Sequence, residues 1–342
     1  MELYLDSVDL KEIQTAFELG TLTGLTTTPT FMHREGVKDI DGMMLKLADM
    51  VPILQVEALG DNADEIVAEA ERLISIGLDP QKTVFKIPVS MEGIKACKRL
   101  HDADRMVNIH LVYTLQQAYM AMIAGATYVC PLVGRLQDQG HDALSLVKQC
   151  VEMVENYGYP TKIMFSSVRH PEHVRNAINL GVHTITVPWK VMKNLTENNF
   201  TTVGTQQFTE HTKLLTLDVK EVIRDANPTV SVLDQVVDAT IQMTESGLGA
   251  VSVLDEGGKL VGIFTDGDLR RALKEKGKKV MDAKMSNFTY NPPLTVKTTA
   301  KLIEAVELIK SKRVDNLIVV NTRKKVVGML DVQDLVKLNL IG

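Results

Sequence analysis

The feature that most constrains this chain is a regular alternation of strand-like and helix-like segments, which continues to about residue 195. Short apolar runs are each followed by segments with apolar residues at helical spacing, as in Ala63, Ile66 and Ala70. Eight such units in succession predict a (β/α)8 TIM barrel, in which parallel strands close on themselves inside a ring of helices. The predicted strands are residues 3–6, 24–27, 53–56, 84–88, 106–112, 128–131, 163–167 and 184–188.

A second architecture follows a polar stretch at residues 193–202. The segment 262–269 recurs as 328–335, an offset of 66 residues (328 − 262). Each copy closes a unit in which a strand, a helix, two strands and a second helix follow one another. We therefore expect a barrel over 1–195, a linker or helix over 196–215, and two repeats over 216–280 and 281–342.

The composition is that of an ordinary globular protein and excludes several classes of partner. The chain has 342 residues, 24% of them charged, and a formal net charge of −5, without the basic stripe that nucleic-acid binding requires. No run of 18 apolar residues is present and the first residues read as a strand, so we expect a cytoplasmic protein without membrane contact. The cysteines Cys97, Cys130 and Cys150 form no CxxC pair, and we expect them in the core. No metal or cofactor is predicted.

Lys86 occupies an unusual position for a lysine. It lies within the apolar run 83–88, which predicts a buried strand. Burial disfavours a charged ammonium group, and a neutral amine is the nucleophile that forms a Schiff base with a carbonyl compound. The pattern therefore makes Lys86 a candidate covalent catalyst. The alternative is a lysine on an edge strand whose amino group reaches solvent.

Residues 1–195 resemble the transaldolase and fructose-6-phosphate aldolase family. The resemblance rests on segments at the C-terminal ends of predicted strands, where barrel enzymes build their sites. It implies a metal-free, class I enzyme in which Lys86 forms the Schiff base with a ketose phosphate or a dihydroxyacetone-type donor. The matching segments are 3–6, 24–30, 85–89, 130–135 and 166–169.

The sequence also departs from that family at positions that would face the substrate. Thr28 replaces an asparagine, His110 stands where a threonine is usual, and Leu132 replaces an aromatic residue. At the strand position that is acidic in transaldolases and often glutamine in the aldolases, this chain has Gln55, and Glu57 two residues later faces the same way. The glutamine favours aldolase-type chemistry. The departures leave open a barrel that binds a sugar phosphate without turnover.

Several polar residues at the predicted strand ends are candidates for the site. Asp6 would orient substrate hydroxyl groups or carry protons, unless it caps the following helix. Arg135 and Arg169 would hold a phosphate with Ser167, since guanidinium groups bind phosphate bidentately, and surface salt bridges are the alternative. His110 is a candidate general acid or base, with a hydrogen-bonded core position equally open. The predicted catalytic residues are Lys86, Asp6, Gln55 and His110, and the predicted substrate-binding residues are Thr27, Thr28, Asn108, Arg135, Ser167 and Arg169.

The two C-terminal repeats resemble a tandem cystathionine-β-synthase (CBS) domain pair, and in particular the pair appended to D-arabinose 5-phosphate isomerases. The resemblance implies a nucleotide or nucleotide-sugar effector, held in the first repeat by Gly262, Thr265 and Asp268. A hydroxyl group and helix-start amides suit phosphate, and a carboxylate suits ribose hydroxyls. In the second repeat Asp331 stands where phosphate would bind. A pair that only assembles the protein into a homo-oligomer is the alternative.

The sequence therefore predicts a Schiff-base aldolase or transaldolase-like enzyme whose CBS pair responds to a nucleotide. Two other functions remain open at this stage. One is a sugar-phosphate-binding regulatory protein without turnover. The other is a lyase or isomerase that uses His110 as a base and forms no imine.

Overall fold

The computed structural model describes residues 1–340. The chain divides into two compact units, residues 1–197 and the residues from 198 onward.

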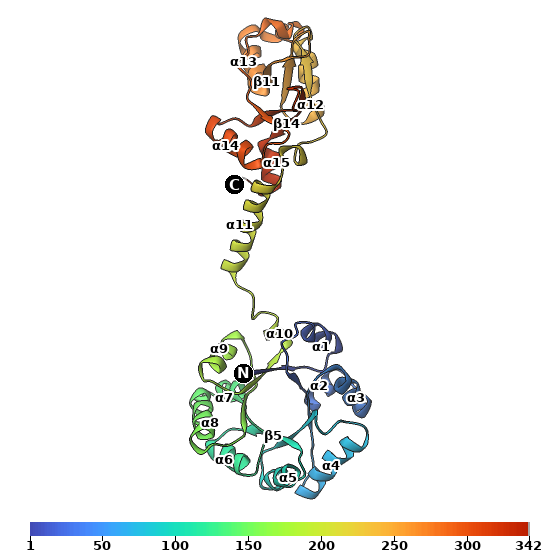
Figure 1. The fold of residues 1–342 in the computed structure, drawn as a ribbon, viewed down its shortest axis with the longest axis vertical. Helices are drawn as coiled ribbons and strands as arrows, with labels where there is room; N and C mark the ends of the chain where they lie inside the picture. The colour runs from blue at the N-terminus through green and yellow to red at the C-terminus, as the bar shows by residue number, and fades with distance from the viewer. Residues whose placement is uncertain (341–342) are drawn as a thin grey trace. The chain divides into compact units, whose positions relative to one another are not determined.

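The first unit is a closed barrel of eight parallel strands, as the sequence predicts (Figure 1). The strands follow one another in chain order, and the last pairs with the first, so that Leu3 lies opposite Ile185. The strands are β1 (Glu2–Asp6), β2 (Gly24–Thr26), β3 (Leu54–Glu57), β4 (Thr83–Pro88), β5 (Met106–Val112), β6 (Tyr128–Pro131), β7 (Lys162–Phe165) and β8 (Thr184–Pro188).

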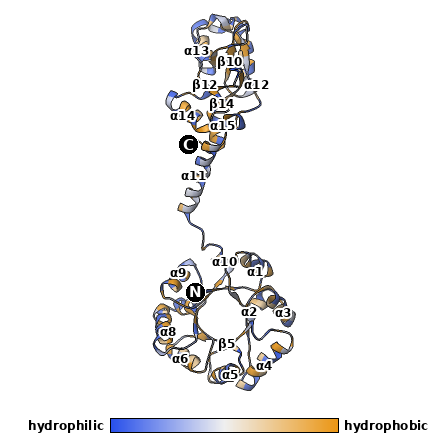
Figure 2. Ribbon diagram, viewed as in Figure 1, coloured by the Kyte–Doolittle hydropathy of each residue, from blue (hydrophilic) through white to orange (hydrophobic). Residues whose placement is uncertain are grey.

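Helices surround the barrel and bury one face each against the strands. In α4, Ile66, Ala70 and Leu73 are buried at helical spacing, and each large apolar side chain contributes about 1.5–3 kcal/mol. The outer ring carries both hydrophilic and hydrophobic residues, as amphipathic helices do (Figure 2). The helices are α1 (Leu10–Phe17), α2 (Pro29–Arg34), α3 (Ile40–Met50), α4 (Ala63–Ser75), α5 (Met91–Asp102), α6 (Leu115–Ile123), α7 (Val133–Asp138), α8 (Ala143–Tyr157), α9 (Pro171–Asn179) and α10 (Trp189–Met192).

The inside of the barrel is apolar toward one end and polar toward the other. Tyr4, Val84, Tyr128 and Met164 form a buried cluster, and the hydroxyl groups of Tyr4 and Tyr128 lie 3.0 Å apart. Burial raises the pKa of both tyrosines above the usual value. The polar side chains therefore gather at the C-terminal ends of the strands, above this packed layer.

The second unit contains two copies of the predicted repeat, each with a three-stranded sheet. In each sheet the middle strand has one parallel and one antiparallel neighbour. A register shift after Val253 recurs after Val319, at the same offset as the sequence repeat. The elements are α11 (Asn199–Thr216), η1 (Val219–Glu221), β9 (Thr229–Ser231), α12 (Val236–Ser246), β10 (Ala250–Leu254), β11 (Leu260–Thr265), α13 (Asp266–Lys276), η2 (Gly277–Asp282), η3 (Met285–Asn287), β12 (Thr295–Lys297), α14 (Leu302–Lys312), β13 (Asn316–Val320), β14 (Val326–Asp331) and α15 (Val332–Lys337).

The helix α11 differs from the others because none of its residues is buried. Phe200 and Phe208 are 88% and 74% exposed, although both are large and apolar. Among residues 1–340, no helix is long and apolar enough to span a membrane.

Candidate active site

A cavity of about 840 Å³ opens where the barrel strands end, and its size suits a small phosphorylated ligand. Thr27 and Gln55 are buried and do not line the cavity. Thr27 directly follows β2, and Gln55 lies within β3. Eight of the predicted site residues line the cavity: Asp6, Thr28, Lys86, Asn108, His110, Arg135, Ser167 and Arg169.

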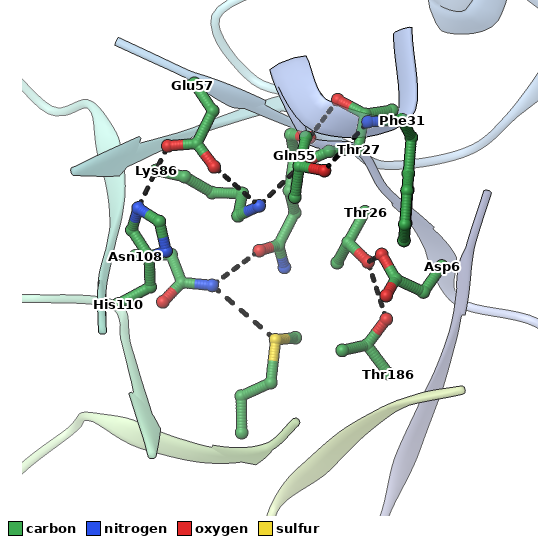
Figure 3. A network of polar contacts seen from close by, with 12 residues as sticks. Asp6, Thr26, Thr27, Phe31, Gln55, Glu57, Lys86, Asn108, His110 and Thr186 are labelled. Atoms are coloured by element: carbon green, nitrogen blue, oxygen red, sulfur yellow. Dashed lines mark hydrogen bonds and ion pairs between the residues drawn. The ribbon is translucent and has the colours of Figure 1, made fainter. Parts of the chain in front are cut away.

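Lys86 is buried, with 5% of its surface exposed, so it is not an edge lysine whose amino group reaches solvent. Its Nζ donates a hydrogen bond of 2.6 Å to the carbonyl oxygen of Thr27. The same Nζ lies 2.9 Å from Oε1 of Glu57, because Glu57 and Lys86 are register partners on β3 and β4 (Figure 3). A nucleophile and a possible base therefore face each other in the cavity.

Glu57 on β3 also lies close to His110, which is on β5, the strand beyond β4. Nε2 of His110 lies 2.9 Å from Oε2 of Glu57, within ion-pair distance but without the alignment of a hydrogen bond. Burial raises the pKa of the Glu57 carboxyl, but Lys86 and His110 outweigh this effect, so the pKa lies below its usual value. The sequence analysis assigned no role to Glu57, and its only signal was the spacing from Gln55.

Gln55 and Asn108 form an amide pair beside Lys86 (Figure 3). Nδ2 of Asn108 donates to Oε1 of Gln55 at 2.7 Å, and both side chains are fully buried. Nε2 of Gln55 and Oδ1 of Asn108 have no hydrogen-bond partner in the described protein. Buried polar atoms rarely stay unpaired. Asn108 lines the cavity, so its Oδ1 is available to a bound ligand or water, whereas Gln55 does not line it.

Asp6 points toward the cavity and is not a helix cap. The side chain that caps α1 belongs to Asp9, which overturns the capping alternative for Asp6. Asp6 accepts a hydrogen bond of 2.9 Å from Oγ1 of Thr26, which lies 2.5 Å from Oγ1 of Thr186. Burial raises the pKa of Asp6 above its usual value, and Lys86 and the Thr26 hydroxyl offset only part of this effect.

Thr28 has a structural role alongside its place in the cavity wall. Its side chain caps α2 and accepts a hydrogen bond from the backbone N–H of Phe31. A hydroxyl at this position therefore fixes the start of the helix that follows β2.

Of the two predicted phosphate-binding arginines, Arg135 lies in α7 and Arg169 in the loop between β7 and α9. Arg135 donates a hydrogen bond of 2.9 Å to the hydroxyl of Tyr113, and within residues 1–340 no carboxylate pairs with it. Arg169 forms a salt bridge of 2.9 Å with Asp138, and both side chains are half exposed. Ser167 has a left-handed φ of 60°, which is uncommon for a residue other than glycine.

His173 fixes the loop that carries Arg169, and the sequence analysis missed it. Its Nδ1 accepts a hydrogen bond of 3.2 Å from the backbone N–H of Arg169, and its Nε2 lies 2.6 Å from Oε1 of Gln137 on α7. Burial lowers the pKa of His173, which favours the neutral ring that this arrangement requires. His173 therefore joins the segments that carry the two arginines.

In the first C-terminal repeat, the residues assigned to a nucleotide bind one another. Thr265 and Asp268 form a capping box at the start of α13, and Asp268 also pairs with Arg271. A Cβ atom on Gly262 would lie 2.4 Å from the ring of Tyr290, so this ring packs directly on the glycine backbone.

The equivalent aspartate of the second repeat is also occupied. Asp334 accepts hydrogen bonds of 2.7–2.9 Å from Nε and Nη2 of Arg224. Asp331 caps α15 through the backbone N–H of Gln333. Two carboxylates therefore lie at the positions equivalent to Thr265 and Asp268 of the first repeat.

A closed (β/α)8 barrel with a buried lysine and two carboxylates at its C-terminal mouth defines a barrel enzyme, and a pair of sheet repeats follows it in the chain. The chain belongs to the Transaldolase/Fructose-6-phosphate aldolase family, whose model matches residues 3–245. It is an enzyme of the aldolase and transaldolase class. The CBS domain model matches residues 219–275 and 285–340.

Individual relatives agree with this assignment. A protein from Coprothermobacter proteolyticus named "Probable transaldolase" is 39% identical over 212 residues, which cover 61% of this chain and 94% of the relative. One of the same name from Desulforudis audaxviator is 38% identical over 210 residues, covering 61% and 95%. A solved CBS domain protein from Pyrobaculum aerophilum, complexed with AMP, is 18% identical, covers 36% of this chain and 98% of its own, and has a TM-score of 0.33. The similarity to the CBS pair of D-arabinose 5-phosphate isomerases stays a prediction.

Proposed function

We propose that the barrel is a class I aldolase or transaldolase in which Lys86 forms a Schiff base with a ketose phosphate or a dihydroxyacetone-type ketose. The observation that carries the proposal is the buried amino group of Lys86, placed on the cavity wall with a carboxylate 2.9 Å away. The imine becomes an iminium ion that withdraws electrons, so the adjacent carbon–carbon bond breaks or forms through an enamine.

The surrounding residues suit the remaining requirements of this chemistry. Asp6, on the opposite wall, would accept the proton of the hydroxyl group whose C–O bond becomes a carbonyl as the carbon–carbon bond breaks. Its raised pKa, caused mainly by burial, brings the carboxylate closer to the strength that a general base needs near neutral pH. The unpaired Oδ1 of Asn108, which lines the cavity, would hold a substrate hydroxyl group or a water molecule.

Arg135, Arg169 and Ser167 would bind the phosphate. Arg135 has no carboxylate partner in the described residues, so binding an anion breaks no existing ion pair. Arg169 would exchange Asp138 for phosphate, and because that salt bridge is exposed it costs little to open.

Borohydride trapping tests the Schiff base. The protein is incubated with fructose 6-phosphate or dihydroxyacetone, reduced with borohydride, and analysed by peptide mass spectrometry. The expected adduct is on Lys86. The Lys190→Met variant is the matched control, because Lys190 also lines the cavity but is not expected to react. This variant should still form the adduct on Lys86. An unmodified Lys86 would favour a sugar-phosphate-binding protein without turnover, and turnover that survives Lys86→Arg would favour a His110-based isomerase.

We propose further that the CBS pair binds a nucleotide or nucleotide sugar in its first repeat and adjusts the activity of the barrel. Thr265 and Asp268 are placed at the start of a helix, where phosphate and ribose contacts are favourable. The second repeat is less suitable, since Asp331 places a negative charge where Thr265 stands in the first.

A thermal-shift panel of nucleotides tests this second proposal. A ligand at 100 times its Kd adds about 2.7 kcal/mol to the stability of the state that binds it. The shift should disappear in Asp268→Ala and persist in Asp334→Ala, measured against each variant without ligand. The absence of any shift would leave assembly into a homo-oligomer as the role of the pair, which sedimentation velocity measures.

A further inference from the structure

We propose that Glu57 is the acid–base residue of the barrel, exchanging protons with Lys86 and with the oxygen atom that leaves during imine formation, and that His110 positions it. The inference rests on the proposed Schiff-base function and assigns a role in it to a residue outside the predicted site.

The geometry places Glu57 between two groups that exchange protons. Three adjacent strands each contribute one residue at their C-terminal ends, and strand register puts Glu57 beside Lys86. One carboxylate oxygen lies 2.9 Å from Nζ of Lys86, and the other lies 2.9 Å from Nε2 of His110 (Figure 3). Each oxygen therefore has its own partner.

The side chain of Glu57 is only 8% exposed, yet it lines the cavity, so a ligand on Lys86 would contact it. Its Oε2 has no aligned hydrogen bond in the described protein, although it is buried. A carboxylate held only by ion pairs can take up a proton without breaking a backbone contact, which a helix cap or turn residue could not do.

The other polar groups near Lys86 are less suited to this role. The carboxylate of Asp6 is hydrogen-bonded to Thr26 and forms no ion pair with Lys86 in the described residues. Gln55 carries an amide, which has no ionisable proton near neutral pH, and its Oε1 is occupied by Asn108. Glu57 is thus the carboxylate in contact with the nucleophile.

The proton steps balance with Glu57 as their single exchanger. The ammonium group of Lys86 gives a proton to the Glu57 carboxylate, and the amine lone pair then forms the bond from Nζ to the carbonyl carbon. The carbonyl electron pair moves to oxygen, which is protonated as Nζ loses a proton, giving the carbinolamine. Glu57 then protonates the carbinolamine hydroxyl group, the C–O bond breaks, and water leaves as the Nζ lone pair forms the iminium ion. Glu57 ends as a carboxylate beside the positive charge.

His110 acts through Glu57 and is a positioning residue. Its ring holds Oε2, so that Oε1 remains directed at Lys86. The charged and titratable groups that act on the Glu57 carboxylate are Lys86 from β4 and His110 from β5, and both favour its ionised form. A neutral side chain in place of His110 should slow imine formation without preventing it.

Chemical rescue tests the role of Glu57 in the full-length protein. In Glu57→Ala, borohydride trapping of dihydroxyacetone on Lys86 should slow by about 10²–10⁴-fold, the usual contribution of general acid–base catalysis. Sodium formate should restore part of the rate, because the small carboxylate fits the space that the mutation leaves. Formate should have no effect on Glu57→Gln, whose amide fills that space, nor on His110→Gln, which keeps the carboxylate. Glu12→Gln is the control, since Glu12 lines the same cavity but is held by Ser7.

The outcomes separate this inference from the proposal that it rests on. If the unmodified protein gives no adduct, the Schiff-base function itself is wrong. If the unmodified protein gives the adduct and Glu57→Gln forms it at the same rate, Glu57 is not the acid–base residue. Lys86 then forms the Schiff base without help from Glu57. Should Glu57→Ala fail to fold, as judged by its melting curve, Glu57→Gln carries the test, because it keeps the size of the side chain and removes only the ionisable group.

Discussion

Gly134 and Ser167 approach each other so closely that a Cβ atom on Gly134 would lie 1.9 Å from the carbonyl oxygen of Ser167. The same Cβ atom would lie 2.9 Å from Nε of Arg169. The absence of a side chain at residue 134 therefore lets α7, which carries Arg135, lie against the loop with Ser167 and Arg169. Glycine at this position is a requirement of the proposed phosphate site.

Gly134→Ala should accordingly weaken phosphate binding. The obstructing atom belongs to the backbone, so the Ser167 loop has to move, at a cost of about 1–3 kcal/mol in stability. We expect KM for a ketose phosphate to rise about tenfold, which is about 1.4 kcal/mol. Steady-state kinetics check this, with phosphate-free dihydroxyacetone as the internal control. An equal change for both substrates would mean that the loop has another role.

Lys86→Met should abolish turnover, with kcat reduced more than about 10³-fold. Removing the ammonium group also leaves the buried Glu57 carboxylate with His110 as its remaining ion-pair partner, so the free energy of unfolding should fall by about 3 kcal/mol. The double variant with Glu57→Gln should regain stability without activity. Urea denaturation measures the effect on stability, and kcat measures the effect on activity. If Lys86→Met turned over substrate at nearly the rate of the unmodified protein, the Schiff-base mechanism would be wrong.

Asp6→Asn should stabilise the protein more at pH 7 than at pH 4. The folded-state pKa of Asp6 is raised, so its favourable contribution is present below the unfolded pKa of about 3.9 and is lost as pH rises through the folded pKa. At neutral pH the buried charge therefore lowers stability, and an amide removes this cost. Urea unfolding at the two pH values tests the sign, and a larger gain at pH 4 would contradict it. Activity should fall in the same variant.

The three cysteines should resist alkylation in the folded protein. Burial raises the pKa of Cys97 to about 12, of Cys130 to about 11 and of Cys150 to about 12. Because the thiolate is the reactive form, iodoacetamide at pH 8 should leave the mass unchanged until denaturant is added. Rapid modification of the native protein would show that one of these side chains is accessible.

Asp334→Ala should destabilise the second unit more than Asp268→Ala does. Asp334 is 10% exposed and is bound by two nitrogen atoms of Arg224, so its loss should cost about 2 kcal/mol. Asp268 pairs with the exposed Arg271 and contributes to a helix cap, for which about 1 kcal/mol is expected. Melting curves of the two variants without ligand provide the comparison. The reverse order would mean that the first repeat is the more tightly built.

Local sequence patterns were sufficient for much of the fold. The eight barrel strands lie within about two residues of their predicted positions, because buried parallel strands are continuous apolar runs that helical segments separate. The repeat at an offset of 66 residues predicted the order of strands and helices along the chain in both halves of the second unit, but not the order of the strands within each sheet. The helix α11 was harder to predict: the sequence left open a linker or a helix over 196–215, because the exposed apolar residues of this segment give a weak helical pattern.

The contacts within the site were less accessible to prediction. The pairing of Glu57 with both Lys86 and His110 depends on the register of three strands, which the sequence alone does not fix. The N-cap of α1 is Asp9 and not Asp6, because the helix begins at Leu10, four residues after Asp6 and not directly after the strand. The sequence around His173 did not indicate its role, since this side chain joins the Arg169 loop to Gln137 of α7, and the two meet only in the folded barrel.

The pairing of β1 with β8 has a consequence for synthesis on the ribosome. Glu2 lies opposite Thr184 and Asp6 opposite Pro188, so β1 has an unsatisfied edge until the eighth strand emerges. At ordinary translation rates this delay lasts about 10–40 s for the nearly 200 residues involved. Lys86 is thus synthesised well before the barrel can close and form the active site. Until then the unpaired edge of β1 is a segment that a chaperone could protect from aggregation.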